Sequence, residues 1–189
     1  MTQSAYCLFE TSLGVCGLAW RESPDPHLPF AVTAFQLPEA TVELTEARIS
    51  QLCGGGKRHE YCAYAATLVD RVQLHAGGKL QDFRDVAVDL GGVGHFVRKV
   101  CEAARQIPVG QTVTYAELAT ALGEPGAARA VGRALGKNPI PLIIPCHRVL
   151  AAHGKPGGFS AYGGRATKAR LLAIEGVPVN LCLELTAGA

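Results

Sequence analysis

The sequence predicts an α/β protein in two parts, a small α/β domain over residues 1–88 and a mostly helical domain over residues 89–189. Short β-like segments separated by turn residues fill the first half, whereas helical periodicity dominates the second half. The glycine-rich stretch Gly91–Gly94 follows the boundary. At 189 residues, of which 48% are hydrophobic, the chain can bury a sizeable core.

The elements of the first half are expected in the following order. CLFETSL and VCGLAWRE are β-like and are separated by a glycine, which predicts an opening hairpin. TVELTEARISQLCGG predicts a helix that ends at a glycine. LQDFRDVAVDL then returns to a strand pattern before GGVG.

The second half is predicted to be helical. HFVRKVCEAARQI has apolar residues at helical spacing. A capping-box pattern over Thr114–Glu117 opens a short helix that runs through Leu122. After EPG, AARAVGRALG predicts a second short helix that ends at Gly136, so the pair is predicted to be a helix-turn-helix. ATKARLLAIEG predicts a last amphipathic helix.

Charge is divided unevenly along the chain. Residues 1–91 carry seven Lys and Arg against eleven Asp and Glu, a net charge of −4, whereas residues 92–177 carry eleven against four, a net charge of +7. A basic half beside an acidic half is typical of a protein whose second half meets a polyanion. A merely solvated surface fits these charges equally well, so charge alone leaves both interpretations open.

Segment lengths and cysteine usage indicate the compartment. No apolar run approaches the roughly 18 residues that span a bilayer, and the start MTQSAYCLFETSLG lacks the basic region of a signal peptide. We therefore expect a cytoplasmic protein without a membrane partner. Seven irregularly spaced cysteines favour reduced thiols over a disulfide framework. Cys53, His59 and Cys62 are too loosely spaced to predict a zinc site, so no metal is expected.

The segment PLIIPCHRVL, residues 141–150, places a cysteine, a histidine and an arginine side by side after an apolar run. A positive potential from His147 and Arg148 would favour the thiolate of Cys146, which is its reactive form. His147 could also relay a proton between Cys146 and a carboxylate, and Glu175 in the last predicted helix is the acid that we pair with it. The alternative is a buried structural cysteine, which the flanking His and Arg make the weaker interpretation.

The second short helix, AARAVGRALG, has an unusual composition. Its packed stripe is predicted to contain Ala128, Val131 and Leu135. The opposite face then carries Arg129 and Arg133 and almost no other side-chain bulk. Such a helix can approach a groove closely, while an arginine attracts phosphates or probes a base stack. A plain core helix with two surface arginines is an equally good interpretation of this helix alone.

Two glycine-rich stretches look like cofactor loops but are expected to be turns. VAVDLGGVGHF resembles the loop that opens a methyltransferase or dinucleotide-binding domain, yet no clear strand with a terminal acid follows at the proper distance. CGGGKRH lacks the Walker spacing and its Ser or Thr. Neither stretch predicts a cofactor site.

Three stretches of the second half, taken together, resemble the O6-alkylguanine-DNA alkyltransferases. They are IPVGQTVTYAELA, AARAVGRALGKNPIPLIIPCHRVL and LLAIEG, and the resemblance covers about residues 89–176. The first half resembles the family's ribonuclease-H-like N-terminal domain in length and strand order. The resemblance therefore implies an α/β fold with a ribonuclease-H-like first domain and a helix-turn-helix in the second.

The resemblance also implies direct reversal of alkylation damage. The protein, expected to be a monomer, would bind alkylated double-stranded DNA through the minor groove and flip the damaged guanine into a pocket. The O6 alkyl group would pass to Cys146 by in-line displacement, and each molecule would act once. No cofactor is implied, because the damaged base is the alkyl donor. O4-alkylthymine is a second substrate that the resemblance leaves open.

Each catalytic residue receives a role from the resemblance. Cys146 would be the acceptor nucleophile, His147 the water-mediated base, and Glu175 the group that orients it. Tyr115 would crowd the 3′ phosphate and donate a proton to guanine N3, which makes the purine oxygen a better leaving group. Asn138 would brace the loop that leads to PCHR.

Recognition residues follow in the same way. Arg129 would replace the extruded base in the stack, and the other DNA contacts would come from Tyr115, Ala127, Ala128, Ala130, Gly132 and Arg133. The carbonyls of Cys146 and Val149 would read the exocyclic amine of the guanine. The loop GGFSAYGG departs from the family's usual GYSGG or GYAGG, and it would line the pocket through Phe159, Ser160 and Tyr162.

Three other functions stay open from the sequence. A non-catalytic protein that recognises alkyl damage would bind damaged DNA while Cys146 stays unmodified. A methyltransferase built on VAVDLGGVG would depend on an added diffusible donor. A helix-turn-helix transcription factor would bind promoters without repair, and PCHR would have no purpose in it.

Overall fold

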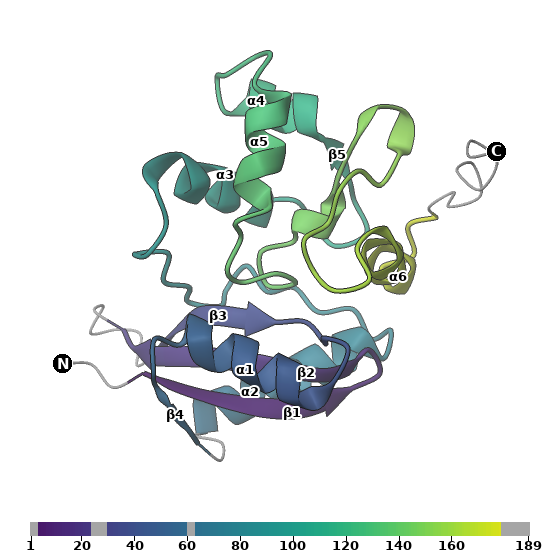
Figure 1. The fold of residues 1–189 in the computed structure, drawn as a ribbon. Helices are drawn as coiled ribbons and strands as arrows, with labels where there is room; N and C mark the ends of the chain where they lie inside the picture. Colours follow the sequence, from purple (N-terminus) through teal and green to yellow (C-terminus); the bar gives the residue numbers. More distant parts are fainter. Residues whose placement is uncertain (1–3, 24–29, 60–62, 179–189) are drawn as a thin grey trace.

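A computed structural model describes residues 4–23, 30–59 and 63–178, which form a sheet-based part and a mostly helical part stacked on it (Figure 1). The first part contains β1 (Ala5–Thr11), β2 (Gly14–Glu22), β3 (Phe30–Gln36), α1 (Val42–Leu52), β4 (Lys57–Arg58) and α2 (Ala63–Ala76). The second contains α3 (His95–Arg105), β5 (Val113–Thr114), α4 (Tyr115–Ala121), α5 (Ala128–Leu135), the 3-10 helix η1 (Cys146–Arg148), β6 (Val149–Leu150), the 3-10 helix η2 (Ala152–Gly154) and α6 (Arg165–Ile174). The predicted α/β class is confirmed.

The sheet has the strand order β3-β2-β1-β4, with α1 and α2 on opposite faces. β1, β2 and β3 are antiparallel, whereas β4 runs parallel to β1. Because side chains alternate along a strand, Tyr6 and Ala19 face α1 while Phe9 joins the core on the α2 side. Gly17 allows α1 to approach closely, since a Cβ there would lie 2.8 Å from the Cβ of Ile49.

The main hydrophobic core continues from the α2 face of the sheet into the second part. Phe9 and Leu18 of the sheet belong to the same cluster as Val100 of α3 and Ile144, which precedes η1. The two parts are thus packed on one core. This packing fixes the ends of α2 and α6 relative to each other, which matters for the site.

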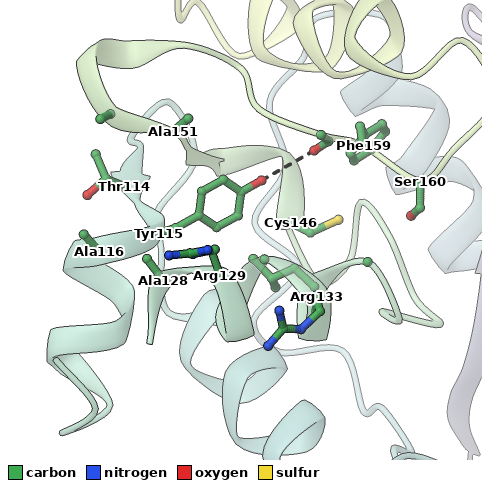
Figure 2. A pocket seen from close by; sticks show the side chains of 15 residues that line it. Thr114, Tyr115, Ala116, Ala128, Arg129, Arg133, Cys146, Ala151, Phe159 and Ser160 are labelled. Atoms are coloured by element: carbon green, nitrogen blue, oxygen red, sulfur yellow. Dashed lines mark hydrogen bonds between the residues drawn. The ribbon is translucent and has the colours of Figure 1, made fainter. Parts of the chain in front are cut away.

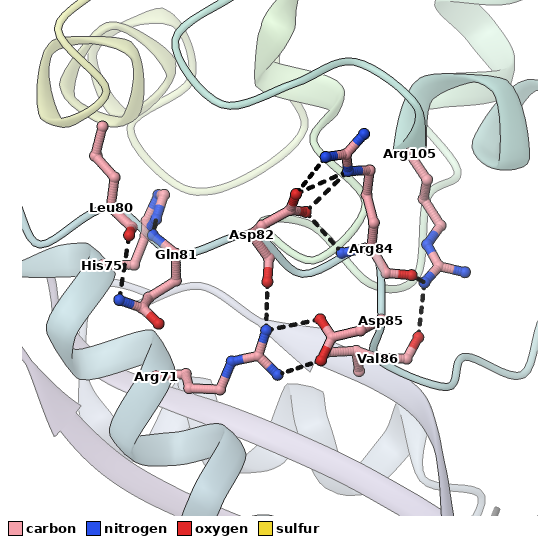
Figure 3. Close-up of polar contacts among 9 residues, drawn as sticks. All are labelled: Arg71, His75, Leu80, Gln81, Asp82, Arg84, Asp85, Val86 and Arg105. Atoms are coloured by element: carbon pink, nitrogen blue, oxygen red, sulfur yellow. Dashed lines mark hydrogen bonds and ion pairs between the residues drawn. The ribbon is translucent and has the colours of Figure 1, made fainter.

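The segment between α2 and α3 is held from both sides by arginines (Figure 3). Arg71 of α2 pairs with Asp85, with 2.7 Å between Nη2 and Oδ1. Arg105 of α3 donates to the carbonyls of Arg84 and Val86 at 3.0 and 2.7 Å. The segment is therefore anchored to both parts of the molecule.

Most of the predicted elements occur as expected. The hairpin, α1, α3 and α6 are present, the capping box at Thr114 and Glu117 opens α4, and Gly136 caps α5. The strand predicted over LQDFRDVAVDL is wrong, because only Val88 forms an isolated bridge, to Val32. Two backbone hydrogen bonds to Val32, from its N–H to the Ala87 carbonyl and from the Asp89 N–H to its carbonyl, join burial of apolar side chains in holding this segment against the sheet, without a longer ladder. β3 and α2 were not predicted.

The sequence predicted neither a membrane span nor a metal site, and the structure bears on both for the residues that it describes. Among the described residues, no helix is long and apolar enough to cross a membrane. No group of three or more potential metal ligands occurs in residues 4–23, 30–59 and 63–178, and Cys62 of the loose cluster with Cys53 and His59 lies outside these ranges. The domain boundary after residue 88 and the cytoplasmic location stay predictions.

Candidate active site

Cys146 opens onto a cavity of about 740 Å³ between α4, α5 and the loop that follows β6 (Figure 2). We call this cavity the Cys146 pocket. Its lining residues are Thr114, Tyr115, Ala116, Ala128, Arg129, Gly132, Arg133, Leu135, Gly136, Cys146, Ala151, Ala152, Gly158, Phe159 and Ser160. The pocket is lined mainly by apolar and small side chains, and it falls within the 300–1,000 Å³ range of small-ligand sites.

The loop before η1 positions Cys146. The Asn138 side chain donates to the Ile144 carbonyl at 2.9 Å and accepts from the Ile140 N–H at 3.0 Å. The Cys146 N–H in turn donates to the Ile144 carbonyl at 2.8 Å. Asn138 therefore ties together both ends of the turn that delivers Cys146 to the pocket.

Glu175, at the end of α6, is a buried carboxylate with several donors. Arg148 binds it through two atoms, Nη2 at 2.7 Å from Oε1 and Nε at 2.8 Å from Oε2. His147 Nε2 lies 3.0 Å from Oε1, and the Gly110 N–H donates to Oε2 at 3.3 Å. Burial opposes ionisation of Glu175, but hydrogen bonds from His147, His75 and Arg148 lower the pKa of its carboxyl well below its usual range.

His147 has its two ring nitrogens in different surroundings. Nε2 faces the Glu175 carboxylate, whereas Nδ1 is buried without a hydrogen-bond partner among the described residues. An ionised Glu175 accepts a proton-bearing nitrogen, so Nε2 carries the hydrogen and Nδ1 is the free base. Burial lowers the pKa of His147 from its ordinary value of 6.5, although Glu175 raises it. His147 is therefore neutral at neutral pH.

The burial of Cys146 opposes the thiolate form that the sequence suggested. Burial raises its pKa, and a side-chain hydrogen bond from Asn138 and the charge of Lys168 lower it only in part. The positive potential expected from His147 and Arg148 is reduced, because burial lowers the pKa of His147 and Glu175 pairs with Arg148. A protonated thiol must lose its proton before it acts as a nucleophile. The neighbouring residue, His147, has a free ring nitrogen in Nδ1.

Lys168 of α6 connects the thiol with Tyr115. Its Nζ donates to the Val149 carbonyl at 2.6 Å, lies 3.4 Å from the Tyr115 hydroxyl, and sits 5.4 Å from the centre of that ring. Burial lowers the pKa of Lys168 to about 8 and raises the pKa of Tyr115, which keeps the phenol protonated. Gly157 covers Tyr115 closely, since a Cβ there would lie 3.0 Å from the ring.

Some comparisons with known proteins match the second half of this chain, and others match most of its length. The family model for the DNA-binding domain of 6-O-methylguanine DNA methyltransferase matches residues 95–177. A methylated-DNA–protein-cysteine methyltransferase of Salmonella typhimurium is 40% identical over 147 residues, 75% of this chain and 84% of that protein. This chain belongs to the methylated-DNA–protein-cysteine methyltransferase family.

Mycobacterial proteins are also similar to this chain. A methylated-DNA–protein-cysteine methyltransferase of Mycolicibacterium paratuberculosis is 46% identical over 110 residues, and the chain spans 64% of that relative's length. The crystal structure of Mycobacterium tuberculosis OGT in complex with DNA superposes with a TM-score of 0.71 at 34% identity, covering 90% of this chain and 92% of that one. The fold is thus shared across both parts.

Most of the residues predicted for a methyltransferase site lie together. Cys146, Tyr115, Arg129, Phe159 and Ser160 line the pocket, as do Gly132 and Arg133 of α5. His147, Glu175 and Asn138 stand behind Cys146, away from the lining. The structure brings these groups together, and their roles in DNA recognition and catalysis stay predictions.

Two predicted side-chain placements need correction, those of Ala128 and Tyr162. Ala128 was expected in the packed stripe of α5 but lines the pocket, and Ala134 is buried with Val131 and Leu135 instead. Ala127 and Ala130, which were predicted to contact DNA, lie outside the pocket lining, and Ala127 packs against the core; their contact with DNA stays a prediction.

Tyr162 is 55% exposed and lies outside the Cys146 pocket, contrary to the prediction. Gly163 and Gly164 have positive φ angles of 78° and 52°, and Thr167 donates to the Tyr162 carbonyl at 2.6 Å, so the chain turns away there. Val149 is buried and its side chain does not line the pocket, but the role predicted for Val149 belongs to its carbonyl, which accepts from Lys168, and that role stays a prediction.

Sequence reasoning missed Lys168 and His75 and misread Arg148. Lys168 carried a usable signal, because it lies three and four residues before Leu171 and Leu172 and so shares the apolar face of α6. A lysine on such a face needs partners, and these are the Val149 carbonyl and Tyr115. His75 had no such signal, since it reaches Glu175 only through the packing of α2 against α6.

Proposed function

We propose that the protein repairs O6-alkylguanine in duplex DNA by transferring the alkyl group, once, to the sulfur of Cys146. The observation that carries the proposal is a buried thiol that opens onto an apolar pocket and is backed by a His147–Glu175 pair with a free Nδ1. The mostly apolar lining suits a flat heterocycle. Membership of the family supports the same reaction.

The first step is deprotonation of the nucleophile. Nδ1 of His147 accepts the thiol proton through a water, and Glu175 stabilises the resulting imidazolium through Nε2. The charge of Lys168 also stabilises the thiolate. Because the thiolate and the imidazolium form only as the reaction proceeds, the resting thiol is a weak nucleophile.

The transfer itself is an in-line displacement at the alkyl carbon. The sulfur–carbon bond forms as the bond between the carbon and guanine O6 breaks, and the electron pair returns to the purine. Tyr115 donates its phenolic proton to guanine N3, and Lys168 stabilises the phenolate that this leaves. The products are a thioether on Cys146 and an unmodified guanine.

DNA access is assigned to α5 and Tyr115. Arg129 and Arg133 are exposed at the pocket mouth, where their charges suit phosphates. Gly132 and Ala128 leave this face of α5 shallow, which suits insertion into the minor groove. The pocket lies beside this face, so a flipped base enters past Arg129, which fills the gap in the stack.

The test is intact and peptide mass spectrometry after the protein is mixed with duplex DNA containing O6-methylguanine. One methyl group on the peptide that holds Cys146, and none on a Cys146→Ala variant, is the expected result. Tight binding with no added mass would reject alkyl transfer and indicate a non-catalytic damage-recognition protein. A reaction that needs an added methyl donor would reject the single-use mechanism.

A further inference from the structure

His75 of α2 is a second imidazole at the Glu175 carboxylate. Its Nε2 lies 3.3 Å from Glu175 Oε1, the same oxygen that His147 Nε2 approaches at 3.0 Å. Both imidazoles and the carboxylate are almost completely buried. Nε2 of His75 makes no hydrogen bond in the described ranges, and the charged atom that it approaches, at 3.3 Å, is Glu175 Oε1.

The segment after α2 determines which nitrogen of His75 carries the hydrogen (Figure 3). The backbone N–H of Gln81 donates to His75 Nδ1 at 3.1 Å. Nδ1 is therefore an acceptor, and the hydrogen of the neutral ring sits on Nε2, toward Glu175. Phe83 packs edge-on against the ring with 5.4 Å between the two centroids, which limits its rotation.

His75 and His147 thus compete for one oxygen. An N–H dipole 3.3 Å from a carboxylate oxygen is attracted by its negative charge even without hydrogen-bond alignment, and it reduces the field that this oxygen exerts on its other neighbours. His75 consequently weakens the stabilisation that Glu175 gives to the His147 imidazolium. The charged and titratable groups around His147 are Glu175 from α6, Arg148 and Cys146 from η1, and His75 from α2.

We infer that His75 is a positioning residue that acts through Glu175 to keep His147 in its neutral, proton-accepting form. The inference rests on the proposed function, because it assigns a regulator to the same base. Under this inference the first part of the molecule takes part in the reaction, because α2 supplies the His75 imidazole, which the second part lacks. His75 itself does not line the Cys146 pocket.

The first test is the pH profile of single-turnover methyl transfer by the full chain with a His75→Phe change. The phenyl ring keeps most of the buried volume and removes the donor. We expect the acid limb to move up by about half to one pH unit, because the His75 dipole then no longer draws on the Glu175 charge that stabilises the His147 imidazolium. The rate below the limb then falls up to about tenfold while the high-pH plateau is retained.

His75→Gln supplies the rescue and His95→Phe the control. Glutamine can present an amide N–H toward Glu175, so its acid limb should return toward that of the unaltered protein. His95 is exposed at the start of α3, away from the pocket, and its replacement should leave the profile unchanged. A plateau that falls equally at every pH, with an unmoved limb, would show that His75 only fills space and would overturn the inference.

A second measurement needs neither a variant nor activity. In the unaltered protein labelled with ¹⁵N-histidine, two-bond couplings report the tautomer of each ring. We expect both His75 and His147 to carry hydrogen on Nε2 at neutral pH, and hydrogen on His75 Nδ1 would overturn the inference. If the unaltered protein transferred no methyl group, the proposed function would fail, yet this spectrum would still decide the His75 contact.

Discussion

Single residues at the site combine burial with a compensating charge. Cys146 is a thiol whose pKa burial raises, and Lys168 is the cation that opposes this effect from α6. The ammonium group is itself held by the Val149 carbonyl and the face of Tyr115. The reactivity of the sulfur therefore depends on a lysine that is distant in sequence.

The Lys168→Met change tests this dependence. It keeps an apolar stem and removes the charge, so the pKa of Cys146 should rise and the transfer rate near pH 7.5 should fall roughly tenfold for each unit of that rise. Single-turnover assays on methylated duplex DNA, stopped at timed intervals, measure the rate of methyl transfer. Lys155→Met, at an exposed position outside the pocket lining, is the matched control and should react normally. An unchanged rate for Lys168→Met would remove Lys168 from the mechanism.

Among the elements, α5 joins the pocket to the proposed DNA surface. Val131, Ala134 and Leu135 bury one side, and the other side offers Arg129 and Arg133. The same eight-residue helix thus anchors in the core and borders the reactive cysteine. Extrusion of a base and reaction with it are therefore separable by substitution on this helix.

The Arg129→Ala change should slow repair of duplex DNA far more than reaction with the free O6-methylguanine base, because only the duplex requires extrusion. Rates on the two substrates provide the comparison. Arg133→Ala is the matched variant. It should reduce the dependence of DNA affinity on log salt by about one unit without separating the two rates. Equal losses on both substrates for Arg129→Ala would reject its role in extrusion.

The elements could be predicted where local rules decide them. The capping box at Thr114, the glycine after α5 and the periodicity of α3 are local, and each prediction is confirmed. The strand predicted before α3 was wrong because the apolar residues of that segment are buried individually against a sheet that is distant in sequence. Similarly, PCHR predicted the cysteine and the histidine, and the last predicted helix supplied the acid, but neither could show that burial raises the pKa of the thiol.

On the scale of the whole molecule, the ionised carboxylate of Glu175 stabilises the folded state. Its folded-state pKa is depressed, so its contribution is fully present above the unfolded value of 4.5 and is lost as pH falls toward the folded value. Replacing it leaves Arg148 buried without its counter-charge. The acid limit of the fold should therefore be sensitive to this one carboxylate.

Urea unfolding of Glu175→Gln at pH 7 should show a loss of about 3–5 kcal/mol, the typical result of breaking a buried pair. The difference from the unaltered protein should shrink as the pH drops below 4.5. Asp85→Asn, which removes an exposed partner of Arg71, should cost less than about 1 kcal/mol. A loss for Glu175→Gln that is constant from pH 7 to pH 3 would show that ionisation of Glu175 is irrelevant to stability.

The contact between His75 and Glu175 has a consequence for modularity. The matched family model begins at residue 95, yet one group at the central carboxylate comes from residue 75. A chimera that grafts residues 89–189 onto another N-terminal half would inherit the cysteine, the base and the acid with a different set of proton donors. Its pH response should then differ from that of this protein, which would make the interchangeable unit larger than the segment that the family model matches.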